Sequence, residues 1–146
     1  VTGPKGERWI KVEDFFLGMY ATELAPDEIL TEVRVPALTG WKSNYLKAAR
    51  RPSDFAIVGI AACFKLGPDQ TCQDIALGVT GVTDRPYRPL EVEAKLKGTK
   101  LDAKALEAAA PALTEGVYVT GNMHASPEFR THLAQVYLGR VIQSAS

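Results

Sequence analysis

The chain has 146 residues, which is enough for one ordinary domain with a buried core. Hydrophobic residues make up 46% of it and charged residues 23%, a composition typical of soluble globular proteins. Seventeen basic and 17 acidic residues give a formal net charge of zero, which argues against a surface for nucleic acids or anionic membranes. The longest apolar stretch, residues 55–64, has the length of a strand, so no membrane span is predicted.

The first 40 residues combine turn-like sequence with short periodic stretches. Residues 1–6 contain two glycines and a proline, with neither an initiator methionine nor a signal-peptide pattern, so we expect the sequence to start inside a longer chain. Residues 7–12 alternate like a short strand, and residues 13–17 read as a helical turn with acidic residues near its start. Residues 29–35 are rich in β-branched side chains and predict a second strand, which Pro36 ends.

Three more strands are predicted in the middle of the chain, at residues 41–50, 55–66 and 72–82. Residues 57–64 are apolar at nearly every position, which indicates a central strand covered on both faces. The turn signal at residues 67–69 makes the last two of these strands an antiparallel hairpin.

After residue 85 the pattern becomes helical. Residues 90–97 form a helix between a proline and a glycine, and Asp102 caps a second helix over residues 103–110, which Pro111 kinks or ends. Ser126 caps a third helix. Five large side chains of that helix fall on one predicted face: Phe129, Leu133, Val136, Tyr137 and Val141. Strands followed by helices predict an α+β fold, a small antiparallel sheet of three to four strands with three helices packed on one side.

No catalytic or metal site is predicted. Cys63 and Cys72 flank the hairpin turn, and two cysteines are too few for a disulfide scaffold or a zinc site. We read them as free thiols of a cytoplasmic protein, with a cross-strand disulfide as the alternative. His124 and His132 are eight residues apart with no third ligand nearby. The paired carboxylates lie at turns and helix starts, where solvation and the helix dipole explain them.

Residues 50–59, RRPSDFAIVG, allow two interpretations. They could be a strand entrance, in which Arg50 and Arg51 point to opposite faces and Asp54 pairs with one of them or caps the turn. They could instead be the edge of a polar ligand or cofactor site, lined by the arginines, Lys47 and Asp54. The glycines of residues 78–81 are read as a strand that bends or meets another backbone closely.

Several stretches carry a resemblance and occur in a fixed order: 15–22 (FFLGMYAT), 27–36 (DEILTEVRVP), 45–51 (YLKAARR), 54–58 (DFAIV), 75–78 (IALG), 86–88 (PYR) and 124–134 (HASPEFRTHLA). Together they resemble the FAD-binding medium subunit of molybdenum hydroxylases, the family of aerobic carbon monoxide dehydrogenase and xanthine dehydrogenase. The resemblance covers nearly the whole chain. It implies that residues 1–40 are the tail of the FAD-binding domain and residues 41–146 the flavoprotein C-terminal domain.

The resemblance also implies a role. Substrate is oxidised at a molybdopterin cofactor in a large subunit, electrons pass through iron–sulfur clusters in a small subunit, and FAD in the medium subunit hands them to an acceptor. The glycine-rich segments that cradle the FAD pyrophosphate belong to the N-terminal FAD-binding half, which this sequence lacks. We therefore expect three partners, namely that half and the two other subunits, and weak or no FAD binding by this chain alone. The alternative is a flavin-free interaction domain on the same fold.

By the same resemblance, Leu30 and Lys47 approach the flavin and Asp54 lies near its edge. Leu30 could equally be plain core. Arg50 and Arg51 are expected to hold subunit or domain contacts rather than FAD. Phe55 and Phe129 are assigned to the core. Two positions depart from the family pattern, since Val79 follows Gly78 where a second glycine is usual, and Asn122 stands in place of an aspartate.

Overall fold

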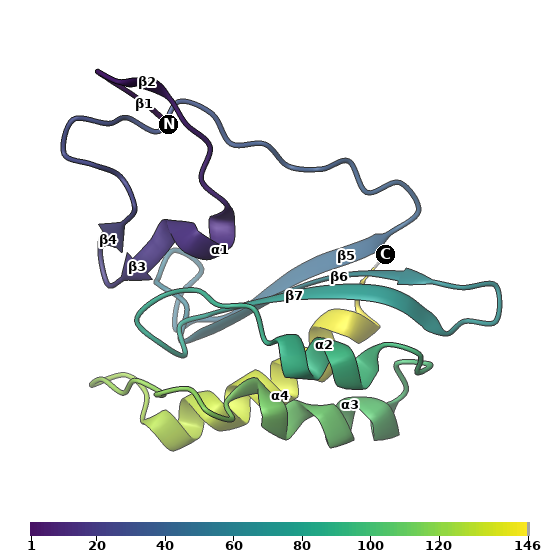
Figure 1. Cartoon of the computed structure of the whole chain (residues 1–146). Helices are drawn as coiled ribbons and strands as arrows, with labels where there is room; N and C mark the ends of the chain where they lie inside the picture. The colour runs from purple at the N-terminus through teal and green to yellow at the C-terminus, as the bar shows by residue number, and fades with distance from the viewer. Residues whose placement is uncertain (146) are drawn as a thin grey trace. The chain divides into compact units, whose positions relative to one another are not determined.

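The computed structural model describes residues 1–145, and the chain divides into two compact units (Figure 1). The first unit is Val1–Thr39, and the second runs from Gly40 to the end of the chain. Within the described part, no helix is long and apolar enough to cross a membrane.

The first unit consists of two small hairpins and one helical turn. Its elements are β1 (Thr2–Gly3), β2 (Gly6–Glu7), α1 (Val12–Phe15), β3 (Phe16–Gly18) and β4 (Ala21–Thr22). The pairs β1–β2 and β3–β4 are antiparallel. The helical turn predicted at residues 13–17 is confirmed over its first residues, whereas the strand predicted at residues 7–12 is wrong beyond Glu7.

The strand predicted at residues 29–35 is also wrong. Ile29 forms an isolated bridge with Thr2, in which each amide donates to the other carbonyl over 2.9 Å. The residues that follow, through Leu38, form neither helix nor strand. Val33 and Val35 are exposed. β-Branched side chains favour a strand where neighbouring strands supply hydrogen bonds and side-chain contacts, and no paired strand follows Ile29 here.

The second unit contains the predicted antiparallel sheet, with the strand order β5-β6-β7. The strands are β5 (Lys42–Ala48), β6 (Val58–Leu66) and β7 (Cys72–Thr80). The prediction of a central strand is confirmed for β6, where Val58, Ile60, Ala62 and Phe64 are buried. The prediction that both of its faces are covered is wrong, because Ala61 on the other face is exposed. The predicted hairpin is confirmed as well, because β6 and β7 pair from Gly59 to Leu66, with a register shift near the turn.

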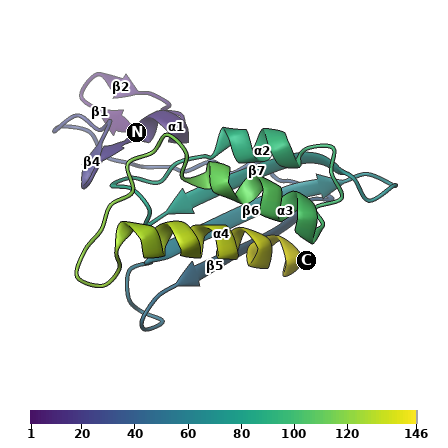
Figure 2. The ribbon, with the colours of Figure 1, turned by 90° about the horizontal axis from the view of Figure 1, so that it is seen from below.

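Helices cover one face of this sheet, as Figures 1 and 2 show, and the α+β fold is confirmed. They are α2 (Leu90–Leu96), α3 (Ala103–Ala109), the 3₁₀ segment η1 (Ala110–Leu113) and α4 (Pro127–Gln143). Both predicted caps form, since the Asp102 carboxylate accepts the Ala105 amide over 2.9 Å and Ser126 Oγ accepts the Phe129 amide over 3.3 Å. Pro111 tightens the chain into η1 rather than simply ending the helix.

The buried face of α4 agrees with the predicted one at Val141 and differs from it elsewhere. Five residues of this helix are buried: Arg130, Ala134, Leu138, Val141 and Ile142. Phe129, expected in the core, is 47% exposed, while Leu133 and Tyr137 lie at the margin of the core. The small Ala134 lies fully buried on the face where α4 packs on β5 and β6, so the larger side chains lie beside that contact.

The start of β6 and the two cysteines complete the comparison. The strand begins at Val58 rather than at residue 55, and Phe55 is 94% exposed, so its assignment to the core is wrong.

Cys63 is half-buried, Cys72 is buried, and both are free thiols. Cys63 lies opposite Ala76 in the hairpin, so the two thiols do not face each other. Burial raises the pKa of both thiols, which makes them poorly reactive.

Candidate functional site

The candidate site is the loop that joins β5 to β6, residues 49–57. Its base is closed by the Ile57 amide, which donates to the Ala48 carbonyl over 2.8 Å. Within it, the Asp54 amide donates to the Arg51 carbonyl over 3.0 Å, so residues 51–54 form a turn. Arg50 and Arg51 therefore lie in a folded loop. They do not lie on a strand with opposite side-chain directions, and that part of the strand-entrance interpretation is wrong.

The Lys47 side chain holds this loop closed by bonding to two of its backbone carbonyls. Its ammonium donates to the carbonyl oxygens of Pro52 and Asp54, each over 2.9 Å. Lys47 lies opposite Gly59 on β6, and its neighbours Leu46 and Ala48 turn toward the helices. Strand alternation therefore puts Lys47 on the opposite face of the sheet.

These contacts leave one N–H donor of the Lys47 ammonium available to a ligand. An ammonium has three N–H donors, and the two loop carbonyls take two of them. Both partners are neutral carbonyls, and the Lys47 side chain is exposed. The contact with Asp54 is to its backbone, so this carboxylate does not neutralise the ammonium through that bond. A positive charge with a spare donor can serve an electron-rich acceptor on a ligand.

Apart from Tyr45, the side chains near Lys47 on this second face of the sheet are small. By strand alternation the face carries Tyr45, Lys47, Gly59, Ala61, Cys63, Ala76, Gly78 and Thr80. A Cβ added at Gly59 would lie 2.5 Å from the Tyr45 hydroxyl, so the tyrosine ring covers that glycine. A Cβ at Gly78 would meet one atom, the Ala61 methyl group at 3.8 Å. The face is therefore a low surface that a flat group can approach.

The structure brings together two of the three predicted site residues. Lys47 and Asp54 meet in the loop described above. Leu30 is part of the first unit, where it follows the Ile29 bridge and is 46% exposed. Its partial exposure speaks against plain core packing within the described chain.

Arg130 is a supporting residue that the sequence reasoning missed. It is 5% exposed, and its Nη1 donates both to the Ile57 carbonyl, at the base of the loop, and to the Gly81 carbonyl, just after β7. Its Nε has no partner among the described residues, and burial lowers the pKa of the guanidinium. A signal was present, because Arg130 shares a helical face with Ala134, Leu138 and Val141.

Gly81 makes the approach of these segments possible. Its φ is +80°, in the left-handed region that favours glycine. A Cβ there would lie 2.6 Å from the Ile57 carbonyl oxygen and 2.8 Å from that of Ala56. The prediction that the glycines of residues 78–81 mark a bend or a close backbone approach is confirmed at Gly81.

Arg50 reaches across to a second loop. Its Nη1 lies 3.0 Å from Nδ1 of His124, which precedes α4. The contact joins the candidate loop to residues 117–126 of the same unit. Both arginines are exposed, and Arg50 is engaged within its own unit.

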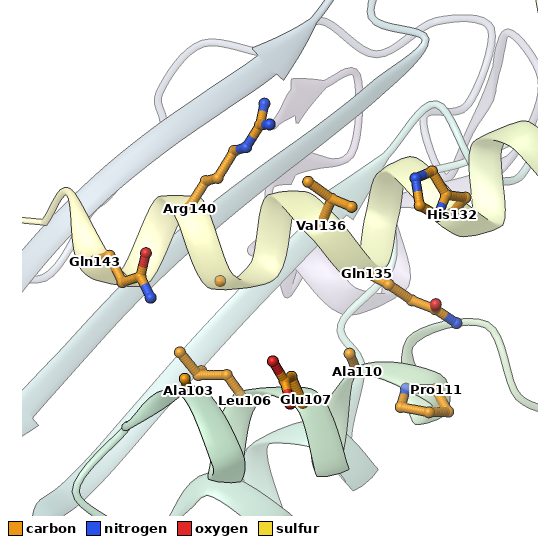
Figure 3. A pocket seen from close by; sticks show the side chains of 11 residues that line it. Ala103, Leu106, Glu107, Ala110, Pro111, His132, Gln135, Val136, Arg140 and Gln143 are labelled. Carbon is orange, nitrogen blue, oxygen red and sulfur yellow. The ribbon is translucent and has the colours of Figure 1, made fainter.

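Two concave features lie elsewhere. A groove of about 410 Å³ runs between α3, η1 and α4 (Figure 3), with Leu106 and Val136 among its apolar lining and Glu107 and His132 among its polar side chains. It lies on the helical side of the sheet, away from the face that carries Lys47. Among the described residues no cluster of side chains could hold a metal ion.

The second concave feature belongs to the first unit and is polar. It is a cleft of about 540 Å³ whose lining includes Arg8 and Glu28. Arg8 donates to both carboxylate oxygens of Glu28, each over 2.7 Å. This pairing lowers the pKa of Glu28 to about 2. The two groups satisfy each other, so this cleft has no uncompensated charge to offer from them.

Comparison with known proteins identifies the family of both parts of the chain. Residues 43–145 match the CO dehydrogenase flavoprotein C-terminal domain, and residues 1–38 match the FAD binding domain in molybdopterin dehydrogenase. The carbon monoxide dehydrogenase medium chain of Afipia carboxidovorans is 33% identical over 99% of this chain and 50% of its own length. The glyceraldehyde dehydrogenase medium chain of Sulfolobus acidocaldarius is 31% identical over 93% of this chain and 48% of its own length.

A solved structure supports the same assignment as these family models and relatives. The crystal structure of the Cu,Mo-CO dehydrogenase in its cyanide-inactivated form matches with a TM-score of 0.91 and 31% identity, over 97% of this chain and 50% of that one. This chain therefore spans about half the length of the relatives that it matches. With a match over most of its residues, the chain belongs to the CO dehydrogenase flavoprotein C-terminal domain family.

Proposed function

We propose that this chain is the C-terminal portion of the FAD-binding medium subunit of a molybdenum-containing hydroxylase. One observation carries the proposal: two family matches follow each other in the order of medium chains, one on each compact unit. On this proposal residues 1–40 are the tail of the FAD-binding domain and residues 41–146 the C-terminal domain. The complete enzyme is a cytoplasmic dehydrogenase, and this portion alone is inactive.

The described residues fit one end of FAD and not the other. Lys47 supplies a positive charge and a spare donor beside a low face of small side chains, which suits the edge of a flat ring. Leu30 would cover a ring face, and Asp54 would lie near the ring edge. The sequence lacks a glycine-rich loop of the kind that presents backbone amides to a pyrophosphate.

The exposed side chains of the first unit support the proposal that another part of the same subunit packs against it. Ten of its large hydrophobic side chains are exposed: Trp9, Val12, Leu17, Met19, Tyr20, Ile29, Leu30, Val33, Val35 and Leu38. Fewer than about 40 residues rarely form a self-sufficient core. We infer that the N-terminal FAD-binding half covers these side chains and contributes the pyrophosphate site.

The redox chemistry belongs to the cofactors. FAD, when bound, takes electrons from the iron–sulfur clusters of a small subunit and passes them to an acceptor, after substrate oxidation at molybdopterin in a large subunit. The residues of this chain bind and orient the flavin, and Lys47 sets the charge beside it. Docking to the two other subunits involves the exposed part of the loop, including Arg51.

A flavin-free interaction domain is the second candidate. The same exposed apolar side chains of the first unit favour it, because they could receive a protein partner that carries no flavin. The two candidates differ in what precedes residue 1 in the gene. An upstream stretch with glycine-rich turns between short strands supports the flavin subunit, and a start codon directly before Val1 supports the interaction domain.

The decisive experiment compares two proteins made from the same gene. We expect the upstream-extended protein to carry about one FAD per chain by its absorbance near 450 nm, because it contains the pyrophosphate site. The 146-residue chain should hold far less. A stoichiometric flavin spectrum from the 146-residue chain would contradict the division of the site, and a folded, colourless extended protein that cannot be loaded with FAD would contradict the flavin function.

A further inference from the structure

The segment formed by Val1 and β1 is hydrogen-bonded on both of its sides. On one side, the nitrogen of Val1 donates to the Arg8 carbonyl over 2.9 Å, and the Arg8 amide donates to the Val1 carbonyl over 3.0 Å. On the other side, Thr2 and Ile29 exchange an equivalent pair of bonds, each over 2.9 Å. Successive residues of a strand direct their backbone groups to opposite sides, as these two pairs do. This segment therefore has the geometry of a middle strand, with a neighbour on each side.

The bridge between Thr2 and Ile29 fixes the register of any strand that continues β1 upstream. In an antiparallel pair, one step back along one chain is one step forward along the other. Val1 therefore lies opposite Leu30, and the residues before Val1 continue along the segment after Leu30. Three residues of that segment lie opposite the first, third and fifth upstream residues: Thr31, Val33 and Val35.

These three residues have the chemistry of an edge strand without a neighbour. All three side chains are β-branched and exposed. Among the described residues, the amides and carbonyls of Thr31, Val33 and Val35 bond to no other backbone group. A row of unpaired backbone groups is a template for a further strand.

A side-chain contact shows that the register of the bridge continues to Thr31. The hydroxyl oxygens of Thr2 and Thr31 lie 3.2 Å apart. Thr31 follows Ile29 by two residues, so it is the diagonal neighbour of Thr2 on the same face of an antiparallel pair. The pairing geometry therefore extends at least one residue pair beyond the bridge.

We propose that, in the complete subunit, the five residues directly upstream of Val1 continue β1 as a strand that pairs with residues 31–35. The proposal deepens the proposed function and rests on it, because that function places the N-terminal FAD-binding half before Val1. The relatives that the chain matches extend beyond it by about its own length, and residues 1–38 match a FAD-binding domain. The pairing ends at Pro36, which has no N–H to donate.

The pairing gives the upstream sequence a definite pattern. The third and fifth upstream residues would place their side chains beside Val33 and Val35, on the face that also carries Ile29. All three of these side chains are at least 70% exposed in the present chain. We therefore expect apolar residues at the third and fifth upstream positions. The same ladder would hold Leu30 opposite Val1, and so orient the side chain proposed to cover a flavin face.

The test introduces a pair of cysteines into the upstream-extended protein. Glu32 lies opposite the second upstream residue at a pair without ladder hydrogen bonds, where Cα atoms are about 4.5 Å apart and a disulfide can form. With Glu32→Cys and a cysteine at the second upstream position, we expect mild oxidation to give a disulfide that mass spectrometry identifies in the linked peptides. The matched control combines Glu32→Cys with a cysteine at the third upstream position. It should remain unlinked, because that side chain points to the other face.

Amide hydrogen exchange provides a second measurement that needs no substitution. The amides of Thr31, Val33 and Val35 should exchange at least about a hundredfold more slowly in the extended protein than in the 146-residue chain, because ladder hydrogen bonds protect them. Protection that appears in the 146-residue chain alone and rises with its concentration would overturn the proposal in favour of a second copy as the partner.

Equal exchange of these amides in both proteins, or a disulfide in the control and not in the matched pair, would also overturn the pairing. Both measurements are made without reference to flavin, and FAD content is measured separately. An extended protein that binds FAD and lacks the pairing contradicts the strand and leaves the proposed function standing. An extended protein that forms the pairing and cannot be loaded with FAD does the reverse.

Discussion

At the residue scale, two positively charged side chains contact the same loop: Lys47 is exposed and Arg130 is buried. Lys47 is exposed and uses two of its three donors on the carbonyls of Pro52 and Asp54. Arg130 is buried and bonds to two backbone carbonyls, with its Nε unpaired among the described residues. The first charge is available to a ligand, and the second holds backbone segments together.

Replacing Lys47 with methionine in the complete subunit should lower the midpoint potential of bound FAD. A positive charge near the ring stabilises the negative charge of its reduced form, so its removal disfavours reduction. We expect a decrease of a few tens of millivolts, since about 30 mV corresponds to a factor of ten for a two-electron couple. Lys47→Arg keeps the charge and should retain most of the potential. Spectroelectrochemistry measures both, and equal potentials for all three proteins would remove Lys47 from the site.

Replacing Arg130 with methionine should destabilise the second unit by about 2–3 kcal/mol. The change leaves the carbonyls of Ile57 and Gly81 without their buried donor. Arg130→Lys retains one charged donor group and should fall between methionine and arginine. Urea unfolding followed by circular dichroism gives the free energies. A methionine variant as stable as the unaltered chain would mean that desolvation of the guanidinium offsets both hydrogen bonds.

At the scale of single elements, α4 shows how a helix can be placed correctly while its buried face is not. Its start follows from Ser126 and Pro127, which cap and open it as predicted. Its face is decided by what it packs on. The small residue Ala134 is fully buried, and the larger Phe129 is not. Size and hydrophobicity along the sequence therefore identified Val141 on the buried face, but missed the small Ala134 and included Phe129.

Two alanine substitutions on α4 distinguish the observed face from the predicted one. Leu138→Ala should cost about 2–5 kcal/mol of unfolding free energy, because it leaves a cavity beneath a fully buried side chain. Phe129→Ala should cost less than about 1 kcal/mol, because nearly half of that side chain remains in solvent. Both values come from the same urea titration. A larger loss for Phe129 than for Leu138 would restore the face predicted from periodicity.

At the scale of the whole molecule, the two units differ in how far they complete themselves. The second unit has one continuous core between the sheet and its helices. The first leaves most of its large hydrophobic side chains exposed and is held by two short hairpins and the Arg8–Glu28 pair. The proposed function assigns that exposed surface to the N-terminal half of the subunit.

Arg51 provides a test of docking in the assembled enzyme. Both arginines are exposed, but Arg50 contacts His124, whereas Arg51 lies at the turn of the loop. We predict that Arg51→Glu in the complete subunit weakens association with the partner subunits and leaves its FAD content unchanged. Size-exclusion chromatography together with flavin absorbance reports both quantities. Loss of flavin from an intact assembly would assign Arg51 to the cofactor site instead.

The sequence by itself determined the features that depend on local chemistry. Strand-like composition and turn residues placed β5, β6 and β7, and cap residues placed α3 and α4. The ordered stretches of resemblance indicated the family before the fold was known. The strands, turns and caps follow from short-range preferences of the backbone, which residues a few positions apart can express.

The tertiary structure alone decided what depends on partners far along the chain. Residues 29–35 have the composition of a strand but form one bridge, because strands need neighbours. Phe55 is exposed because the chain turns at residues 51–54 before β6 begins. Arg130 supports the loop 73 positions before it, and His124 meets Arg50 across 74 positions. Such contacts are set by the packing of whole elements, which no local pattern encodes.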